Sequence, residues 1–337
     1  MRIVIVGFGT VGQNLARIIQ SKEKQLLKEF GFHPRVVAVA DRSGVMIDTK
    51  GLDLERALTV KRMKGSVAQD PELGRPGVDA KEVIEGVEAE VVIELTPTNV
   101  TDGEPGLSHI KTALRSQRHV ITTNKAPLAI AMPSLMEMAS YNKVLLRFSG
   151  TVGGGTPILD LAKKCFNGNK IASLRGILNG TTNHVLTKMT DSNASMDEAL
   201  KEAQASGYAE ADPSYDIDGV DTACKLVILA NCVMGRESSI RDVKIEGIRK
   251  VSFEKLEKAR GKNSQVKLIG SIGDEIRVRP EPIPRNHPLC VRGTLNAVSF
   301  KTELMGEVTV VGKGAGGVET ASAVLRDIVD VRRTLAK

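Results

Sequence analysis

The sequence predicts a two-domain α/β protein, and three observations carry that prediction. The chain has 337 residues, more than one small domain needs to bury a core. In its first half, short continuous apolar runs typical of buried parallel strands alternate with helical stretches. In its second half, helical stretches come first and a series of short strands follows. We therefore expect one domain over 1–140, completed by a C-terminal helix at about 313–337, and an α+β domain over 141–312.

The composition limits the classes of function. The net charge of +7 suits an anionic ligand, yet Lys and Arg are interspersed with acids. Aromatic residues are only 3% of the chain, so few side chains could stack on bases and we expect no nucleic acid partner. The longest apolar runs are too short for a membrane span, so no membrane association is expected either. The four cysteines lack C-x-x-C spacing and no signal peptide is visible, which predicts a cytoplasmic protein.

A glycine-rich turn follows the first predicted strand at once. Residues 2–6 read RIVIV, and GFGTVG then places Gly7, Gly9 and Gly12 in G-x-G-x-x-G spacing before an amphipathic helix. The first glycine permits the turn, the second lets a pyrophosphate approach the backbone, and the third permits close packing of helix on strand. The helix N-terminus then presents its free N–H groups to the phosphates. This order predicts a Rossmann-like domain that binds NAD or NADP.

The end of the second predicted strand bears on the choice between these cofactors. The strand RVVAVAD ends at Asp41, where an acid usually accepts hydrogen bonds from the adenosine ribose of NAD. The adjacent Arg42 could instead bind the 2′-phosphate of NADP. Nearby Lys61, Arg62 and Lys64 either add to that positive charge or form an ordinary basic surface. The choice between NAD and NADP therefore stays open.

Polar loops follow two later strands, EVVIE and HVITT. In a doubly wound sheet, ligands bind beyond the carboxyl ends of the strands, so Thr96 and Lys125 are expected in a pocket rather than on an outer face. The residues predicted to contact the dinucleotide are Gly7, Phe8, Gly9, Thr10, Val11, Gly12, Asp41, Arg42, Thr96, Lys125 and Gly316.

The densest group of ionisable residues lies at 207–225, GYAEADPSYDIDGVDTACK. Asp218 is predicted to cap a helix that runs on through LVILANCVMG. Asp221 and Lys225 are four residues apart, so on that helix they lie within ion-pairing reach. The pair is either an ordinary helix start or part of a site for a small zwitterion in which a lysine moves a proton. A lysine can serve as that base once burial or another cation lowers its pKa toward neutrality.

Seven segments, in order along nearly the whole chain, carry a family resemblance: GFGTVG, ELTPTNVTDGEPG, TTNKAPLA, GTVGGGTPI, GILNGTTN, GYAEADPSYDIDGVDTACK and GKGAGGVETASAVLRDI. Together they resemble homoserine dehydrogenases of the short form, without a regulatory ACT domain. The resemblance implies reversible NAD(P)-dependent oxidation of L-homoserine to L-aspartate 4-semialdehyde. This is a step in threonine, methionine and isoleucine biosynthesis. It also implies a homodimer.

The same resemblance implies roles for individual residues. Lys125 and Lys225 would be the two active-site lysines, and Asp221 would be one of the substrate-site acids. We add the hypothesis that these three residues are catalytic: both lysines meet over one nicotinamide ring, either of them moves the proton, and Asp221 orients its neighbour. The implied substrate contacts are Glu210, Asp216, Tyr208, Gly180 and Thr181. A sodium ion would be held by the main-chain carbonyls of Val152, Gly154 and Thr156, although Ser149 stands where the family often has an acid.

Two other interpretations stay open at this point. One is a different NAD(P)-dependent oxidoreductase that acts on a related amino acid or semialdehyde. The other is a non-catalytic redox sensor that binds a dinucleotide and regulates a partner. Because a sensor has no need of paired lysines and acids, turnover of an amino alcohol would separate the two classes.

Overall fold

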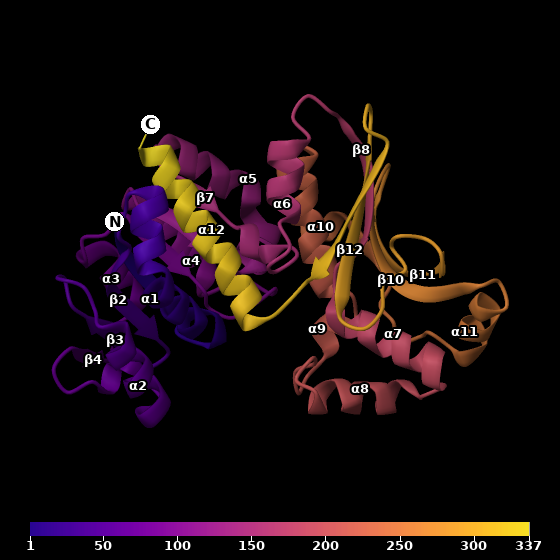
Figure 1. Ribbon diagram of the computed structural model, residues 1–337, viewed down its shortest axis with the longest axis horizontal. Coiled ribbons are helices and arrows are strands. Elements are labelled where there is room, and N and C mark those ends of the chain that lie inside the picture. Colours follow the sequence, from indigo (N-terminus) through magenta and orange to yellow (C-terminus); the bar gives the residue numbers. More distant parts are fainter. Residues whose placement is uncertain (337) are drawn as a thin grey trace. The chain divides into compact units, whose positions relative to one another are not determined.

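The computed structural model describes residues 1–336, and Lys337, the last residue of the predicted C-terminal helix, lies outside the described residues. The chain forms two compact units. The first unit comprises Met1–Thr151 together with the chain from Gly317 onward, and the second comprises Val152–Gly316. Each unit has its own sheet, and Figure 1 labels many of the elements of both. The mixed α/β class predicted from the sequence is confirmed, while the function expected of each domain stays a prediction.

The first unit contains a seven-stranded sheet in the order β4-β3-β2-β1-β5-β6-β7. Its strands are β1 (Arg2–Val6), β2 (Arg35–Asp41), β3 (Gly44–Ile47), β4 (Gly74–Pro76), β5 (Val91–Glu94), β6 (His119–Thr122) and β7 (Leu146–Arg147). Strands β2, β1, β5, β6 and β7 are neighbours in that order and pair in parallel. Strands β3 and β4 extend the sheet beyond β2 with antiparallel pairing. Strand β1 has β2 on one side and β5 on the other, so the winding of the sheet reverses there. Ligands of such sheets bind at that reversal.

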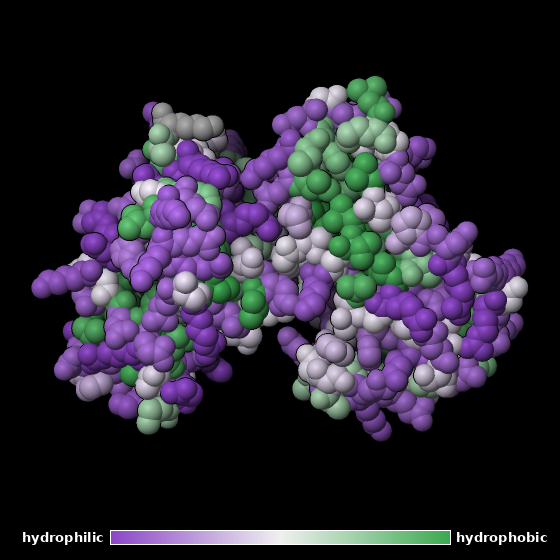
Figure 2. All heavy atoms as spheres, viewed as in Figure 1, coloured by the Kyte–Doolittle hydropathy of each residue, from purple (hydrophilic) through white to green (hydrophobic). Residues whose placement is uncertain are grey.

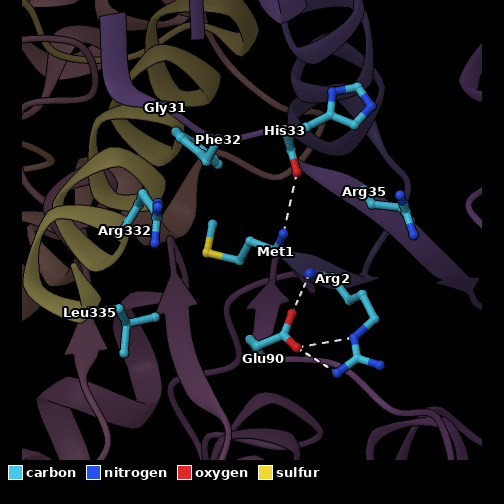
Figure 3. A pocket seen from close by; sticks show the side chains of 9 residues that line it. All are labelled: Met1, Arg2, Gly31, Phe32, His33, Arg35, Glu90, Arg332 and Leu335. Atoms are coloured by element: carbon cyan, nitrogen blue, oxygen red, sulfur yellow. Dashed lines mark hydrogen bonds and ion pairs between the residues drawn. The ribbon is translucent and has the colours of Figure 1, made fainter. Parts of the chain in front are cut away.

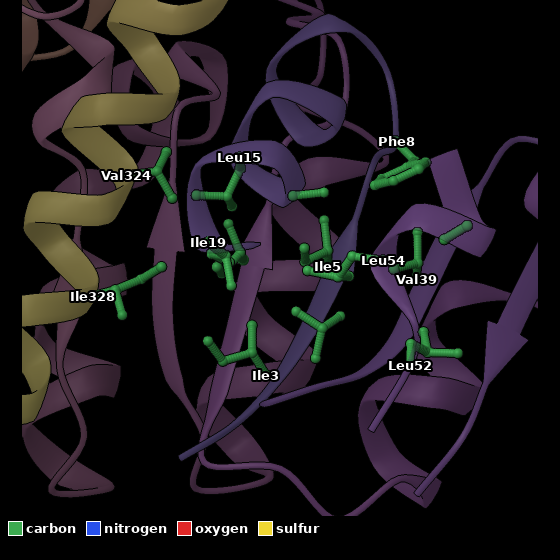
Figure 4. Close-up of a cluster of buried hydrophobic side chains, with 14 of the residues drawn as sticks. Ile3, Ile5, Phe8, Leu15, Ile19, Val39, Leu52, Leu54, Val324 and Ile328 are labelled. Carbon is green, nitrogen blue, oxygen red and sulfur yellow. The ribbon is translucent and has the colours of Figure 1, made fainter. Parts of the chain in front are cut away.

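Helices connect the parallel strands of the first unit. They are α1 (Thr10–Phe30), α2 (Leu54–Lys64), α3 (Ala80–Gly86), α4 (Gly106–Arg115) and α5 (Lys125–Tyr141). Strand β1 is almost fully buried, as its apolar sequence predicts, and its Ile3 and Ile5 pack with Leu15 and Ile19 of α1 in one core cluster (Figure 4).

The C-terminal helix α12 (Gly317–Leu335) belongs to the first unit. Its Val324 and Ile328 are fully buried in the same core cluster as α1 (Figure 4). Polar contacts fix it further: Asp327 accepts hydrogen bonds from the backbone N–H of Ser149 at 2.8 Å and from its hydroxyl at 2.6 Å. The last part of the chain thus completes the core that its first strand begins.

The second unit contains a six-stranded sheet in the order β13-β12-β8-β10-β11-β9. Its strands are β8 (Ile171–Ile177), β9 (Val243–Ile245), β10 (Ser264–Ile272), β11 (Ile276–Pro284), β12 (Leu295–Thr302) and β13 (Glu307–Lys313). All neighbours pair antiparallel except β9 and β11. Its helices are α6 (Ile158–Asp160), α7 (Gly180–Ser192), α8 (Met196–Ala205), α9 (Ser214–Ile217), α10 (Val220–Val233) and α11 (Phe253–Arg260). Of these, α7, α10 and α11 pack against β10.

The start of α10 differs from the sequence prediction. Asp218 was expected to cap this helix, and that expectation is wrong. The residue before the helix is Gly219, whose φ of 85° turns the chain into α10 without any side-chain cap. Asp218 instead accepts a hydrogen bond from Arg249 Nη2 at 2.9 Å on the exposed surface. Glycine reaches this conformation without strain, so the chain enters α10 here without a capping side chain. The carboxylate of Asp218 therefore pairs with Arg249 instead of capping the helix.

None of the helices within residues 1–336 combines the length and the apolar character that a membrane crossing requires.

Candidate active site

The glycine-rich turn leaves open backbone where β1 ends. Gly7 has φ +100°, and a Cβ there would lie 2.7 Å from the carbonyl carbon of Leu95. A Cβ on Gly12 would lie 2.4 Å from the carbonyl oxygen of Gly7, so α1 packs directly on the turn. A Cβ on Gly9 would meet no atom within 4 Å, and no side chain caps α1. Open space in front of uncapped N–H groups fits the pyrophosphate of a dinucleotide.

The side chains around this turn differ in exposure. Phe8 is 1% exposed and packs into the core, so only its backbone faces a cofactor. Thr10 is exposed and Val11 is half-buried. Gly316, with φ 131°, is the last residue of the second unit, and its expected contact with the dinucleotide stays a prediction.

Asp41 at the end of β2 is already well bonded. Its carboxylate accepts hydrogen bonds from Lys61 Nζ at 2.7 Å, from Ser66 Oγ at 2.7 Å, and from the N–H groups of Val67 and Ser43 at 3.0 Å each. Burial alone would raise the pKa of Asp41, but these four bonds together hold it below its usual value. A carboxylate offers about four acceptor positions, and those of Asp41 are used within this loop. Few acceptor positions are left for the hydroxyl groups of a ribose.

Arg42, one residue further, is exposed. No ion pair joins its guanidinium to another side chain within residues 1–336. Lys61, by contrast, is bound to Asp41. Arg42 is thus the cation at the end of β2 that is available to an incoming phosphate group.

A buried carboxylate that the sequence analysis missed organises the loops near Lys125. Glu94 ends β5 with no exposed surface and accepts hydrogen bonds from the Thr96 N–H at 2.9 Å and from Thr122 Oγ1 at 3.0 Å. The side-chain oxygen of Asn124 accepts a hydrogen bond from the N–H of Ala126 and so caps the N-terminus of α5. Lys125 is the first residue of that helix. The sequence offered one hint of this carboxylate: Glu94 is a single acid at the end of an otherwise apolar predicted strand.

In the second unit, a buried ion pair stands at the start of α10. Lys225 Nζ lies 2.6 Å from Asp221 Oδ2 and also donates to the carbonyl oxygen of Leu178 at 2.6 Å. The two side chains are only 9% and 7% exposed. Asn179 Nδ2 donates to Asp221 Oδ2 at 2.9 Å and to Asp216 Oδ1 at 2.6 Å. One lysine, one amide and two carboxylates thus form a single connected group.

The pKa of Asp216 is shifted by its surroundings in this group. Burial raises the pKa of Asp216, and the negative charge of Asp221 raises it further, while the hydrogen bond from Asn179 offsets part of the shift. With both acids ionised, the group carries one negative charge more than Lys225 neutralises. Because an uncompensated buried charge is unfavourable, the site is suited to a ligand that brings a positive charge.

Comparison with known proteins decides the family. A family model described as homoserine dehydrogenase matches residues 157–329, and one described as glutamate/leucine/phenylalanine/valine dehydrogenase matches residues 1–96. A homoserine dehydrogenase of Methanocaldococcus jannaschii is 45% identical over 338 residues, covering 100% of both chains. The chain belongs to the homoserine dehydrogenase family. The resemblance seen in the sequence motifs is therefore confirmed.

Two further relatives bear on the cofactor of this family. An NAD(+)-dependent homoserine dehydrogenase of Pseudomonas canavaninivorans is 39% identical, over 100% of this chain and 97% of its own. A solved structure of a hyperthermophilic archaeal homoserine dehydrogenase in complex with NADPH is 32% identical, with a TM-score of 0.87 over 100% of this chain and 98% of that one. Members of the family are thus described with either dinucleotide.

The structure brings most of the predicted substrate residues of this homoserine dehydrogenase family member to one place. Gly180 is the first residue of α7, and a Cβ on it would lie 2.9 Å from the carbonyl oxygen of Thr294. Thr181 Oγ1 donates to the carbonyl oxygen of Tyr208 at 2.9 Å, which ties α7 to the acidic loop. Glu210 is exposed and its carboxylate has no ion-pair partner within residues 1–336. Glu210 is therefore the one predicted acid outside the buried group.

Tyr208 lies at the edge of this region. Its side chain is 51% exposed, and its ring centroid is 5.3 Å from that of His184. Asn179, which bridges the two buried acids, was not among the predicted site residues. The only sequence signal was its place before Gly180 in the polar turn NGTT.

Lys125 lies in the first unit and Lys225 in the second. Their expected meeting over one nicotinamide ring therefore stays a prediction.

The proposed sodium ligands lie in a turn at the start of the second unit. Val152 is fully buried, Gly154 has φ 53°, and Thr156 Oγ1 donates to the carbonyl oxygen of Lys313 at 3.1 Å. No group of three or more His, Cys, Asp or Glu within the described chain could hold a metal ion. Carbonyl oxygens suit a hard cation, so a sodium ion here stays a prediction that depends on the main chain alone.

Proposed function

We propose that this protein catalyses the reversible oxidation of L-homoserine to L-aspartate 4-semialdehyde with NAD or NADP. The reaction is a step in threonine, methionine and isoleucine biosynthesis. One observation carries the proposal: the buried group formed by Lys225, Asp221, Asn179 and Asp216. It places a proton donor, fixed by an acid, beside a second acid that suits an ammonium ion.

Substrate binding follows from the charge of this group. Homoserine carries an α-ammonium, which Asp216 attracts because the site has excess negative charge. Glu210 is exposed and has no partner in the described chain, so it is available to a second contact with the same ammonium. Gly180 and Thr181 at the start of α7 present backbone N–H groups to the substrate carboxylate.

Proton transfer is assigned to Lys225. An ammonium has three N–H donors, and two of those of Lys225 are directed to Asp221 and to Leu178. The third is free to bond the reacting oxygen. In semialdehyde reduction Lys225 donates this proton to the oxygen, and in the opposite direction the neutral amine accepts the hydroxyl proton. Asp221 holds the lysine in place, and Lys125 binds the same oxygen or the substrate carboxylate.

The dinucleotide, when bound, takes hydride from the substrate carbon or returns it. Gly7, Gly9 and Gly12 are suited to its pyrophosphate because the backbone is open at Gly9. Arg42, with Lys61 nearby, is suited to the 2′-phosphate that distinguishes NADP from NAD. Initial rates with homoserine and each dinucleotide measure both the activity and this preference.

Two lysine substitutions test the catalytic assignment. Lys225→Met and Lys125→Met should each lower kcat/KM for homoserine by about 10²–10⁴-fold, as expected for loss of a proton-transferring group. Lys201→Met is the matched control, because Lys201 is an exposed lysine on α8. Turnover close to wild type in folded Lys225→Met protein would remove Lys225 from the mechanism.

We further propose that the protein is a cytoplasmic homodimer with a sodium ion at Val152, Gly154 and Thr156. Figure 2 shows apolar side chains gathered over the strands around β12. Val311 on β13 is 48% exposed and Leu295 on β12 is 37% exposed, and such apolar surface favours pairing of two copies. Light scattering after gel filtration gives the mass, and rates in sodium against potassium salts test the cation.

A further inference from the structure

The first unit has a pocket of about 620 Å³ at the end of its sheet where β1 and β2 begin. Met1 lies at its centre, and its walls include Phe32, Arg35, Arg332 and Leu335 (Figure 3). Cavities of this size hold small organic molecules. Strand β1 starts at this pocket and ends at the glycine-rich turn, so the pocket and the dinucleotide turn occupy opposite ends of one strand.

The pocket holds more positive charge than its acids neutralise. Arg2 is neutralised locally, since it forms ion pairs with Glu88 and Glu90 at 2.6 Å each. Neither Arg35 nor Arg332 has an ion-pair partner within residues 1–336. Two guanidinium groups on different elements, β2 and α12, therefore line one cavity without counter-charge.

Arg332 also has an unsatisfied polar atom. Its Nε is shielded from solvent yet has no hydrogen-bond acceptor within the described chain. A buried donor without an acceptor is unfavourable, and most buried polar groups in proteins are paired. An oxyanion in the pocket would supply the missing acceptor.

The N-terminal ammonium of Met1 is also affected by the charges of Arg35 and Arg332. Met1 donates to the carbonyl oxygen of His33 at 3.3 Å (Figure 3). Burial lowers the pKa of the Met1 ammonium, and the charges of Arg35 and Arg332 lower it further against the opposing effect of Glu90. The charged form of this amine is thus disfavoured chiefly because it is buried, and the two arginine charges add to that effect.

We propose that this pocket binds a small organic anion. Its phosphate or carboxylate bonds to Arg332, whose planar guanidinium group matches oxyanions and whose Nε lacks an acceptor. The charge of Arg35, on the opposite side of Met1, adds to the attraction (Figure 3). Its apolar part lies against Phe32 and Leu335, which are 5% and 47% exposed. The residues that line this pocket differ from those of the glycine-rich turn and from those of the Lys225 group.

The test is calorimetric titration of the full chain, with a reduced dinucleotide present to occupy the glycine-rich turn. The probes are phenyl phosphate, benzoate and inorganic phosphate at matched ionic strength. We expect one equivalent of phenyl phosphate or benzoate to bind, with the stronger of the two identifying the acid group. Inorganic phosphate should bind about tenfold more weakly, because it has no apolar part to bury.

The variants locate the binding. Arg332→Gln should weaken binding of the aromatic anion by about tenfold or more, since it removes a charge-assisted hydrogen bond. Arg35→Gln should weaken it by less, since it removes only a nearby charge. Arg17→Gln should bind as wild type does, because Arg17 is an exposed arginine on α1 outside the pocket. Arg332 is the decisive position, and Arg332→Lys, which keeps the charge but loses the planar guanidinium group, should also bind the anion more weakly. Unchanged affinity in folded Arg332→Gln and Arg332→Lys proteins, or no binding of any probe by the wild type, overturns the proposal.

Discussion

Two buried lysines in the second unit have opposite surroundings. Lys225 on α10 lies 2.6 Å from Asp221 and retains a small exposed area. Lys267 on β10 is 0% exposed, and its Nζ donates only to neutral oxygens, Asn183 Oδ1 at 2.8 Å and Thr187 Oγ1 at 3.0 Å. Burial lowers the pKa of Lys267 to about 8.

The difference separates the lysine to which we assign proton transfer from one whose contacts are structural. Lys225 is charge-compensated, retains a small exposed area, and is joined to a second acid through Asn179. Lys267 is sealed between α7 and β10, where no substrate can reach it. Its hydrogen bonds hold the helix that begins with Gly180 and Thr181, so it acts on the site only through the position of α7.

The largest expected effect comes from removing the acid of the functional pair. Asp221→Asn should lower kcat/KM for homoserine by about 10²-fold or more, because Lys225 loses the carboxylate that orients its proton. The matched control is Asp218→Asn, three residues earlier, whose exposed pair with Arg249 contributes only about 0.2–1 kcal/mol. Equal losses of activity in the two variants would show that the buried pair has no special role.

A smaller effect, on stability, is expected from Lys267. The folded protein releases the Lys267 proton near pH 8, while the unfolded chain keeps it to about 10.5, so the unfolded state binds more protons between these values. Stability contributed at this site therefore rises with pH across that window, by about 1–3 kcal/mol. Urea unfolding of wild type and Lys267→Met at about pH 7 and pH 10 measures it. If the difference between the two proteins does not change with pH, Lys267 is not desolvated as the structure indicates.

The smallest effect is expected from a surface lysine on the same helix. Lys188 on α7 lies 2.9 Å from Glu202, and the two side chains are 35% and 47% exposed. Lys188→Ala should change the free energy of unfolding by about 1 kcal/mol or less and leave kcat/KM unchanged, because water screens the pair. A loss of activity in this variant would mean that any disturbance of α7 impairs catalysis, which would weaken the contrast between Lys225 and Lys267.

Local sequence patterns predicted features that depend on neighbours in the chain. The glycines at positions 7 and 12 of the turn follow from steric demands that few other residues meet. The pairing of Asp221 with Lys225 follows from the helical repeat. The cap assigned to Asp218 failed because Gly219 changed the local backbone, and a pattern of residue types does not report a left-handed φ.

The sequence by itself determined the α/β class, the glycine-rich turn and the pair on α10, because each rests on periodicity or on residues close together in the chain. It also indicated the family, through the resemblance of seven segments to homoserine dehydrogenases. Only the tertiary structure decided that Asn179 bridges Asp216 and Asp221, that Glu94 is buried among threonines, and that Arg332 of the last helix reaches the pocket at Met1. These contacts join residues between 28 and over 300 positions apart. Their energies depend on burial, and burial is a property of the assembled fold that no short stretch of sequence contains.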